Sequence, residues 1–329
     1  MITTSRFVPA WWLRNRHLQT IVPNTFRRLP RLELRRERIE LPDGDFVDAD
    51  WTANTHGPIV VLLHGLEGSR DSRYAAWLLR RVHDLGWRGV LLHFRGCSGE
   101  PNRLARGYHS GHTEDFDHFL KLLRQREPDS DIAAVGYSLG GNVLLKWLGE
   151  TGDAGSLFTA VAVSVPFRLE ECSSAIERGF ARIYQSHLLR RMRASTLRRL
   201  HLIQQAGFSP RLDRVNTFRR FDDAITAPLH GFRNAEDYYA KCSSIGFLRH
   251  IRTPTLVLHA LDDPFMTPRV IPSEEDLSPA VTLELSSHGG HVGFVSGRWP
   301  WKPRYWLEER IIAHLRDAHA GTTARREVA

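Results

Sequence analysis

Cysteine is scarce in this 329-residue chain. Cys97, Cys172 and Cys242 are far apart, and their number is odd. No Cys-x-x-Cys pair occurs, so the sequence offers neither a disulfide framework nor a cysteine-based metal pair. This use of cysteine is typical of proteins in a reducing compartment, and we expect a cytoplasmic protein.

Long apolar runs are also missing. No stretch approaches the roughly 18 apolar residues of a membrane-spanning helix, and residues 1–20 lack the continuous apolar core of a secretory signal. The start of the chain is instead aromatic and basic, which predicts an N-terminal arm, residues 1–33, packed on the core. Peripheral contact with an anionic membrane is the alternative for its residues Phe7, Trp11, Trp12, Arg14 and Arg16.

Nucleic-acid signatures are absent despite a net charge of +8. The cations are scattered, and there is no arginine-rich tail, zinc-finger spacing or RNA-binding aromatic motif. Net charge alone says nothing about fold. We therefore expect no nucleic-acid partner, and no obligate protein partner is evident from the sequence.

Short apolar runs that alternate with helical patterns are present instead. This alternation predicts an α/β protein with a mostly parallel sheet and helices on both faces. Two β-like runs at 34–54 flank the turn Asp43-Gly44. Further strands are expected at 58–65, 87–96, 131–138, 158–166, 254–263 and 281–290, and helices at 74–86, 115–127, 141–150 and 306–319.

The alternation breaks over residues 168–250. Helical, arginine-rich and aromatic patterns replace the buried-strand runs there, over a length too great for a simple loop. We interpret this segment as a helical cap or lid inserted into a core formed by 34–167 and 251–319. The remaining segment, 320–329, is expected to be a disordered tail.

The stretch "VGYSLGGN" contains the pattern Gly-x-Ser-x-Gly around Ser138. A predicted strand precedes it and a predicted helix follows, which is the context of a nucleophile on a strained turn. Glycines two residues before and after the serine let the strand and the helix approach closely. A glycine-rich packing turn without catalytic function is the alternative interpretation.

A serine nucleophile needs a base and a group that orients that base. The order Ser, Asp, His is that of α/β-hydrolases, and both partners follow predicted strands here. We assign Asp263 as the acid, with its neighbour Asp262 as the alternative. We assign His291 as the base, after Gly289-Gly290, with His288 as the alternative.

Acyl transfer also needs two N–H donors for the negative oxygen of the transition state. The amide of Leu139, directly after the serine, is one candidate. The second is the amide of Leu66 in "HGLEGS", where His64 is expected to brace the loop rather than act as a base.

A histidine-rich stretch, "HSGHTEDFDH", suggests a metal site built from His109, His112, Asp115 and His118. The competing interpretation is a helix start with Thr113 as N-cap and acids in the first turn. We favour the helix start and expect no bound metal.

Several blocks in order resemble one family: "VVLLHGLEGS", "FRGCSGEPNR", "VGYSLGGNVLLKWLGE", "FDDAITAPLHGF", "PTLVLHALDDPFM" and "SSHGGHVGFV". From about residue 6 to about residue 316 the chain is similar to the YheT-like esterase/hydrolase family of the α/β-hydrolase superfamily. The resemblance implies the α/β-hydrolase fold with a helical cap. It also implies carboxylic ester hydrolysis, with a charge-relay set that falls on Ser138, Asp263 and His291.

The expected activity is that of a serine esterase without a cofactor. Its substrates would be small-molecule esters with short- to medium-chain acyl groups, or lipid-like esters. An acyltransferase that uses the same three residues is one alternative. A catalytically silent binding module with the same fold is the other.

Overall fold

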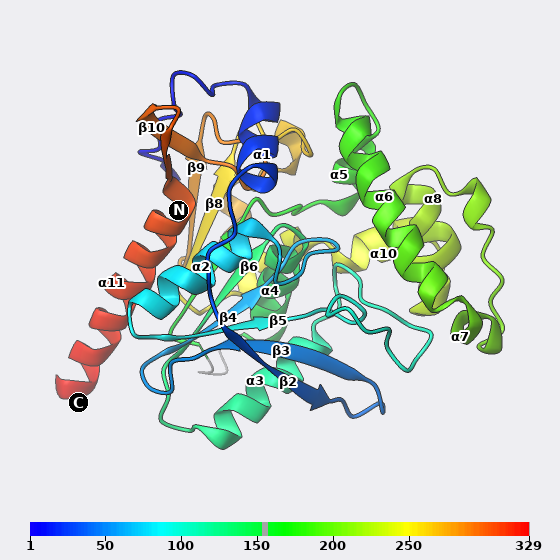
Figure 1. Ribbon diagram of the computed structural model, residues 1–329, viewed down its shortest axis with the longest axis horizontal. Coiled ribbons are helices and arrows are strands. Elements are labelled where there is room, and N and C mark those ends of the chain that lie inside the picture. Colours follow the sequence, from blue (N-terminus) through cyan, green and yellow to red (C-terminus); the bar gives the residue numbers. More distant parts are fainter. Residues whose placement is uncertain (153–156, 329) are drawn as a thin grey trace.

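The computed structural model describes residues 1–152 and 157–328. Residues 153–156, inside the predicted core range 34–167, and residue 329, the end of the predicted tail, lie outside the described residues. Within the described part, nine strands form one sheet in the order β1-β9-β8-β7-β6-β4-β5-β3-β2 (Figure 1). The predicted α/β fold class is confirmed.

The strands are parallel except for β3, which runs antiparallel to its neighbours β5 and β2. The central strands β4, β6, β7 and β8 are buried along their whole length, as their continuous apolar runs predicted. In sheet order the strands are β1 (Ile2–Thr4), β9 (Val281–Ser286), β8 (Thr255–Ala260), β7 (Thr159–Val163), β6 (Ile132–Tyr137), β4 (Ile59–Leu63), β5 (Arg88–Leu92), β3 (Phe46–Thr52) and β2 (Leu34–Glu40).

Helices cover both faces of the sheet (Figure 1). The apolar side chains of α2 (Arg73–Asp84) and α11 (Trp306–Val328) pack on one face. Those of α3 (Glu114–Arg126) and α4 (Leu139–Thr151) pack on the other. Successive strand residues alternate between these two clusters, because side chains along a strand point to opposite faces. Among the described residues, no helix is long and apolar enough to cross a membrane.

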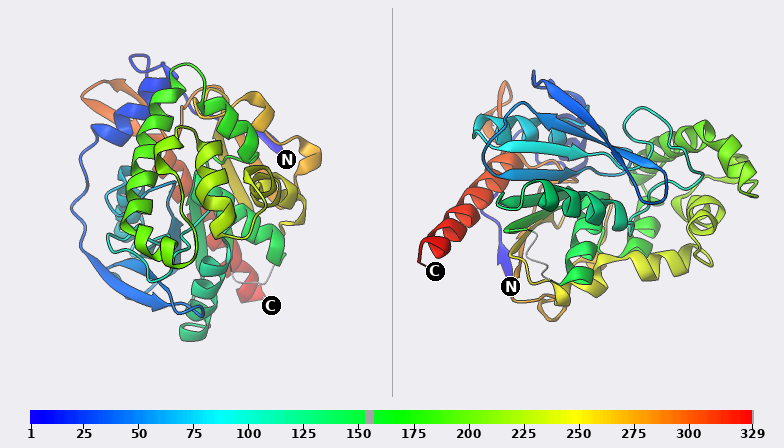
Figure 2. Two further views of the ribbon diagram at one scale, coloured as in Figure 1. Left: turned by 90° about the vertical axis from the view of Figure 1, so that its right-hand side faces the viewer. Right: turned by 90° about the horizontal axis from the view of Figure 1, so that it is seen from below.

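The segment between β7 and β8 is helical and forms a cap beside the sheet (Figures 1 and 2). Leu189, Val215, Phe221 and Ile225 give it a small apolar cluster of its own. Its elements are α5 (Leu169–Ile176), α6 (Ala181–Arg198), α7 (Leu200–Gln205), η1 (Leu212–Arg214), α8 (Phe218–Phe221), the π-helix η2 (Asp222–Thr226), α9 (Ala227–Leu229), α10 (Ala235–Cys242) and the 3₁₀ segment η3 (Ser244–His250).

The N-terminal arm contributes β1 to the edge of the sheet and a short helix, α1 (Arg16–Thr25). Buried Gln19 of α1 ties the arm to the later chain. Its Nε2 donates to the carbonyl of Val295 at 2.9 Å, and its Oε1 accepts from the amide of Val295 at 2.7 Å. A hairpin that the sequence pattern did not predict starts there, with strands β10 (Val295–Trp299) and β11 (Lys302–Tyr305).

The C-terminal segment differs from its prediction. Helix α11 extends from Trp306 to Val328, so the chain is helical over most of the segment 320–329 that was expected to be disordered. Thr322 donates from its side chain to the carbonyl of Ala318 at 3.0 Å, one turn earlier. No proline interrupts this segment, and apart from Gly321 its residues are compatible with a helix, so the backbone continues.

Two short 3₁₀ turns complete the described elements. These are η4 (Pro268–Val270) and η5 (Glu274–Asp276), both between β8 and β9. Ser273 and Asp276 form a reciprocal capping box around η5, which fixes the course of the chain between the two strands.

Candidate active site

Ser138 occupies the single residue between β6 and α4, with φ at +51°. This left-handed conformation is rare for a residue with a side chain and marks a strained turn. A Cβ atom on Gly136 would lie 2.5 Å from the carbonyl oxygen of Gly140. One on Gly140 would lie 2.5 Å from the carbonyl oxygen of His64. Both glycines are therefore required by close backbone approach, as the sequence predicted.

Three side chains from separate loops meet at this turn. His291 Nε2 lies 3.0 Å from Ser138 Oγ. On its other side, His291 Nδ1 lies 2.8 Å from Asp263 Oδ2. Asp263 is 1% exposed and His291 8% exposed, so the carboxylate is held away from water behind the imidazole. The arrangement can take a proton from the serine and hold the resulting imidazolium.

The alternative residues form a separate pair. His288 Nδ1 lies 3.3 Å from Asp262 Oδ2, and the His288 side chain is nearly half exposed. Asp262 Oδ1 also accepts a hydrogen bond from the amide of Gly290 at 2.9 Å. Asp262 thus fixes the turn that leads to His291. Within the described residues, neither Asp262 nor His288 contacts Ser138.

Neighbouring groups fix the orientation of His291. The ring of Phe265 stacks on the imidazole with a centroid separation of 4.0 Å, and the amide of Phe265 donates to Asp263 Oδ1 at 2.9 Å. The backbone amide of His291 donates to Thr20 Oγ1 at 2.9 Å. The sequence patterns singled out neither Phe265 nor Thr20. The one signal in the sequence for Phe265 was its position two residues after the predicted acid, Asp263.

Leu66 and Leu139 both line the cavity that contains Ser138. Among the described residues, neither amide donates a hydrogen bond. His64 is fully buried: its Nδ1 lies 2.7 Å from the Gly65 carbonyl, and its Nε2 accepts from the amide of Phe94 at 3.2 Å. Burial lowers the pKa of His64 to about 3, so this residue is a neutral brace of the loop.

A cavity of about 770 Å³ lies between the cap and the carboxyl ends of the strands. This volume suits a medium-sized organic ligand. The cap supplies apolar side chains to the lining, which also contains Ser138 and His291. The cap residues include Ile176, Ile183, Leu188, Met192, Phe221 and Ile225.

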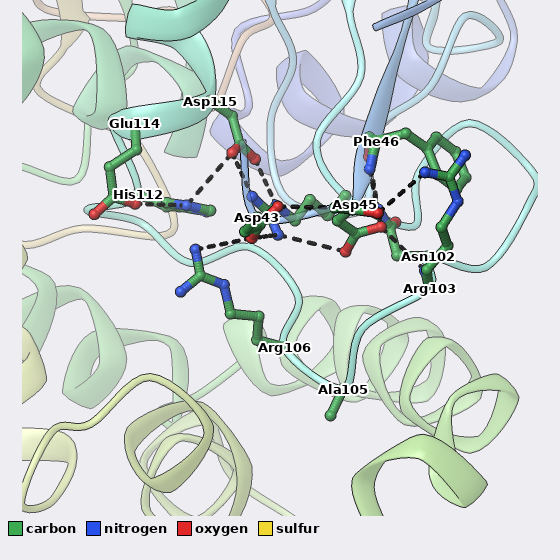
Figure 3. Close-up of polar contacts among 12 residues, drawn as sticks. Asp43, Asp45, Phe46, Asn102, Arg103, Ala105, Arg106, His112, Glu114 and Asp115 are labelled. Atoms are coloured by element: carbon green, nitrogen blue, oxygen red, sulfur yellow. Dashed lines mark hydrogen bonds and ion pairs between the residues drawn. The ribbon is translucent and has the colours of Figure 1, made fainter. Parts of the chain in front are cut away.

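The histidine-rich stretch does not gather a metal site. Across the described ranges, no group of His, Cys, Asp and Glu side chains has an arrangement that could hold a metal ion. His112 Nε2 lies 2.7 Å from Glu114 and 3.6 Å from Asp115. Figure 3 shows His112 directed toward these two acids. Thr113 precedes α3, but its hydroxyl donates to Glu150 at 2.8 Å instead of capping the helix.

Comparison with known proteins gives the same fold. A family model described as alpha/beta hydrolase fold matches residues 58–297. The YheT protein of Escherichia coli (strain K12), named as a candidate esterase, is 47% identical over 94% of this chain and 92% of its own length. Phospholipase ABHD3 of Mus musculus is 29% identical over 92% of this chain and 77% of its own length.

Among solved structures, the esterase Pf2001 of Pyrococcus furiosus covers 88% of this chain and 90% of its own, at a TM-score of 0.51 and 16% identity. At that identity the likeness shows the fold alone. The family match spans most of the chain, and the identity to YheT extends over nearly its whole length. The chain therefore belongs to the α/β-hydrolase family, as a YheT-like member.

Proposed function

We propose that this protein is a serine hydrolase that cleaves carboxylic esters through an acyl-enzyme on Ser138. The observation that carries the proposal is the hydrogen-bonded series Asp263–His291–Ser138, which opens into a cavity. The names of two relatives, YheT as a candidate esterase and ABHD3 as a phospholipase, support ester hydrolysis.

In the proposed reaction, Ser138 Oγ attacks the ester carbonyl while His291 Nε2 accepts the hydroxyl proton. Asp263 accepts a hydrogen bond from Nδ1–H, which keeps Nε2 free as the acceptor and stabilises the imidazolium. His291 then donates the proton to the leaving alcohol. A water molecule, deprotonated by the same imidazole, attacks the acyl-enzyme and releases the acid.

The tetrahedral intermediates carry negative charge on the former carbonyl oxygen. We propose that the amides of Leu66 and Leu139 donate to that oxygen. Their freedom from other partners supports this assignment, because a donor already engaged elsewhere would have to give up a hydrogen bond. One such donor typically contributes about 3 kcal/mol to the transition state.

The apolar wall formed by the cap supports an acyl chain as the group bound beside Ser138. Each methylene group that the cavity removes from water contributes about 0.8 kcal/mol. The volume of about 770 Å³ fits esters with short- to medium-chain acyl groups or lipid-like esters.

A fluorophosphonate probe tests the proposal, because it reacts with serines activated by a neighbouring base. The label is located by peptide mass in the wild-type protein and in the variants Ser138→Ala and His291→Ala. We expect labelling at Ser138 that both variants lose. The matched control His288→Ala should keep it, since His288 does not contact the serine. An unlabelled but folded wild-type protein would favour a binding module over an enzyme.

A further inference from the structure

Arg199 is a buried cation with an incomplete set of partners. It lies at the junction of α6 and α7 and is 8% exposed. Its Nη1 donates to the carbonyl oxygen of Ala105 at 2.8 Å, whereas its Nε is buried without a hydrogen-bond partner. In the part of the chain that the structure describes, no carboxylate forms an ion pair with it. Arg199 also belongs to the wall of the cavity that contains Ser138.

The carboxylates of Asp43 and Asp115, which belong to the network behind the loop of Ala105, are already engaged. Arg95 donates to Asp115 and to Asp43, each at 2.7 Å. The loop that carries Ala105 is tied to the same network, because Asn102 Nδ2 and the amide of Arg103 both donate to Asp45 Oδ1 (Figure 3). The carbonyl that Arg199 contacts is therefore held in place, but the acids of this network face Arg95. The guanidinium gains a rigid support there without gaining a counterion.

A second cation, Arg191, lies about two helical turns before Arg199 and also lines the cavity. Its Nη2 donates to the backbone carbonyl of Glu67, and again no described carboxylate pairs with it. The absence of a side chain at Gly107 leaves room for the Arg199 guanidinium. A Cβ on Gly107 would lie 2.8 Å from Arg199 Nη2, so a larger residue there would displace it.

Three carboxyl groups line the cavity, but among the described residues none of them forms an ion pair with Arg199 or Arg191. Burial raises the pKa of Glu67, whose Oε1 accepts from the Tyr108 hydroxyl at 3.0 Å. Burial also raises the pKa of Asp222, to about 6, and Asp222 accepts from Tyr239 at 2.7 Å. Asp71 is exposed at the rim.

A buried charge without a counterion is costly, and proteins normally pair it. An arginine stays protonated even when buried. Glu67 and Asp45 favour the charge of Arg199, but among the described residues neither forms an ion pair with it. An anionic ligand would supply a direct partner. Guanidinium groups fit carboxylate and phosphate oxygens through two parallel hydrogen bonds. A ligand in the cavity with such an anionic group would give the Arg199 charge the ion-pair partner that it lacks.

We propose that Arg199, assisted by Arg191, binds a carboxylate or phosphate group of the ester substrate while its scissile carbonyl lies at Ser138. This inference rests on the proposed ester hydrolysis and adds a substrate class to it: esters that carry an anionic group. The apolar wall of the cap would contact the chain between the two ends.

Binding is tested first, because it does not depend on turnover. Calorimetry on Ser138→Ala with octyl phosphate, octanoate and neutral 1-octanol compares the two anionic groups with an uncharged head. We expect at least one anion to bind about tenfold or more tighter than octanol, as a charge-assisted hydrogen bond provides. The anion whose affinity exceeds that of octanol by the larger factor shows whether the subsite prefers phosphate or carboxylate. Equal binding of all three probes would overturn the proposal.

Adding Arg199→Gln to the Ser138→Ala protein should abolish the preference for the anion, and adding Arg191→Gln should reduce it. The matched control Arg190→Gln changes an exposed cation of α6 that is not part of the cavity wall, and it should leave the preference unchanged. Because Arg191 is exposed, its variant keeps the test valid if Arg199→Gln fails to fold. Preference retained in a folded Arg199→Gln variant would refute the assignment.

Kinetics separate this inference from the proposed function. The kcat/KM of the wild-type protein is compared for 4-nitrophenyl esters of ω-carboxy acids and for their ω-methyl esters, over several chain lengths. A parallel arm compares acylglycerol phosphate with monoacylglycerol. The protein could label with the fluorophosphonate and turn over neutral esters, yet show no preference for anions in kinetics or calorimetry. That result would contradict only the anion subsite. Anion binding without labelling or turnover would contradict only the ester hydrolysis.

Discussion

Thr20 and His291 are joined by a hydrogen bond across 271 positions of the sequence. The backbone amide of His291 donates to Thr20 Oγ1 at 2.9 Å, and the same hydroxyl donates to the carbonyl of Arg16 at 2.8 Å. Thr20 lies on α1, so the N-terminal arm forms one wall of the candidate active site and holds the loop of the proposed base.

Replacing Thr20 by valine should lower kcat by about tenfold, because the His291 amide loses its partner and the imidazole loses its fixed position. The buried, unpaired amide should also lower the free energy of unfolding by about 1–3 kcal/mol. Ester turnover and urea unfolding measure the two effects. Thr20→Ser keeps the hydroxyl and should restore turnover. If valine changes stability alone, Thr20 has no positioning role.

Gly140 should not tolerate a methyl group. Its Cβ would lie 2.5 Å from the carbonyl oxygens of His64 and Leu63, and backbone atoms cannot move aside cheaply. Gly140→Ala should lower the free energy of unfolding by about 2–4 kcal/mol, as measured by urea unfolding. Gly246→Ala is the matched control, since nothing lies within 4 Å of its Cβ position. Equal stability of the two variants would contradict the close packing inferred for this turn.

The sequence predicted the elements whose signals are local. The glycines around Ser138 marked a close turn, and buried apolar runs marked the parallel strands. Parallel strands end at one edge of a sheet, so their order also predicted which loops converge. The loops of Asp263 and His291 do converge on Ser138.

Contacts between distant segments left no local signal. The hydrogen bond from His291 to Thr20 depends on how α1 docks. The partners of Arg199 depend on the placement of the cap on the loop of Ala105. Adjacent candidates such as Asp262 and Asp263 also look alike in sequence, and only the fold turns one toward the imidazole. The helical end of α11 differed from prediction because composition alone did not reveal that the helix would continue.

Asp263 and Asp262 should respond differently to replacement by asparagine. Asp263→Asn favours the wrong tautomer of His291 and should lower kcat by about 10³- to 10⁴-fold. Asp262→Asn keeps an oxygen that can accept from the Gly290 amide, so its loss should stay below about tenfold. Steady-state kinetics on one neutral ester compares the two variants. A larger loss for Asp262→Asn would reverse the assignment of the acid.

Asp222 should make the protein less stable as the pH rises. An acid in an ion pair has the opposite effect, because its contribution to stability grows as the pH rises. Burial raises the pKa of this carboxyl to about 6, against about 3.9 in an unfolded chain. Between these values the folded state holds a proton that the unfolded state has released. The stabilising contribution is therefore fully present below about pH 4 and is lost as the pH rises through 6.

The hydroxyls of Thr226 and Tyr239 each donate to a different oxygen of Asp222 at 2.7 Å. Asp222→Asn removes the titration and keeps one of these two acceptor oxygens. The free energy of unfolding of the wild type, relative to this variant, should fall by about 2 kcal/mol between pH 4 and pH 7. Urea unfolding at several pH values measures the difference. Tyr239→Phe removes a donor that stabilises the carboxylate, so it should shift the fall to higher pH. A difference that stays constant with pH would mean that Asp222 titrates alike in both states.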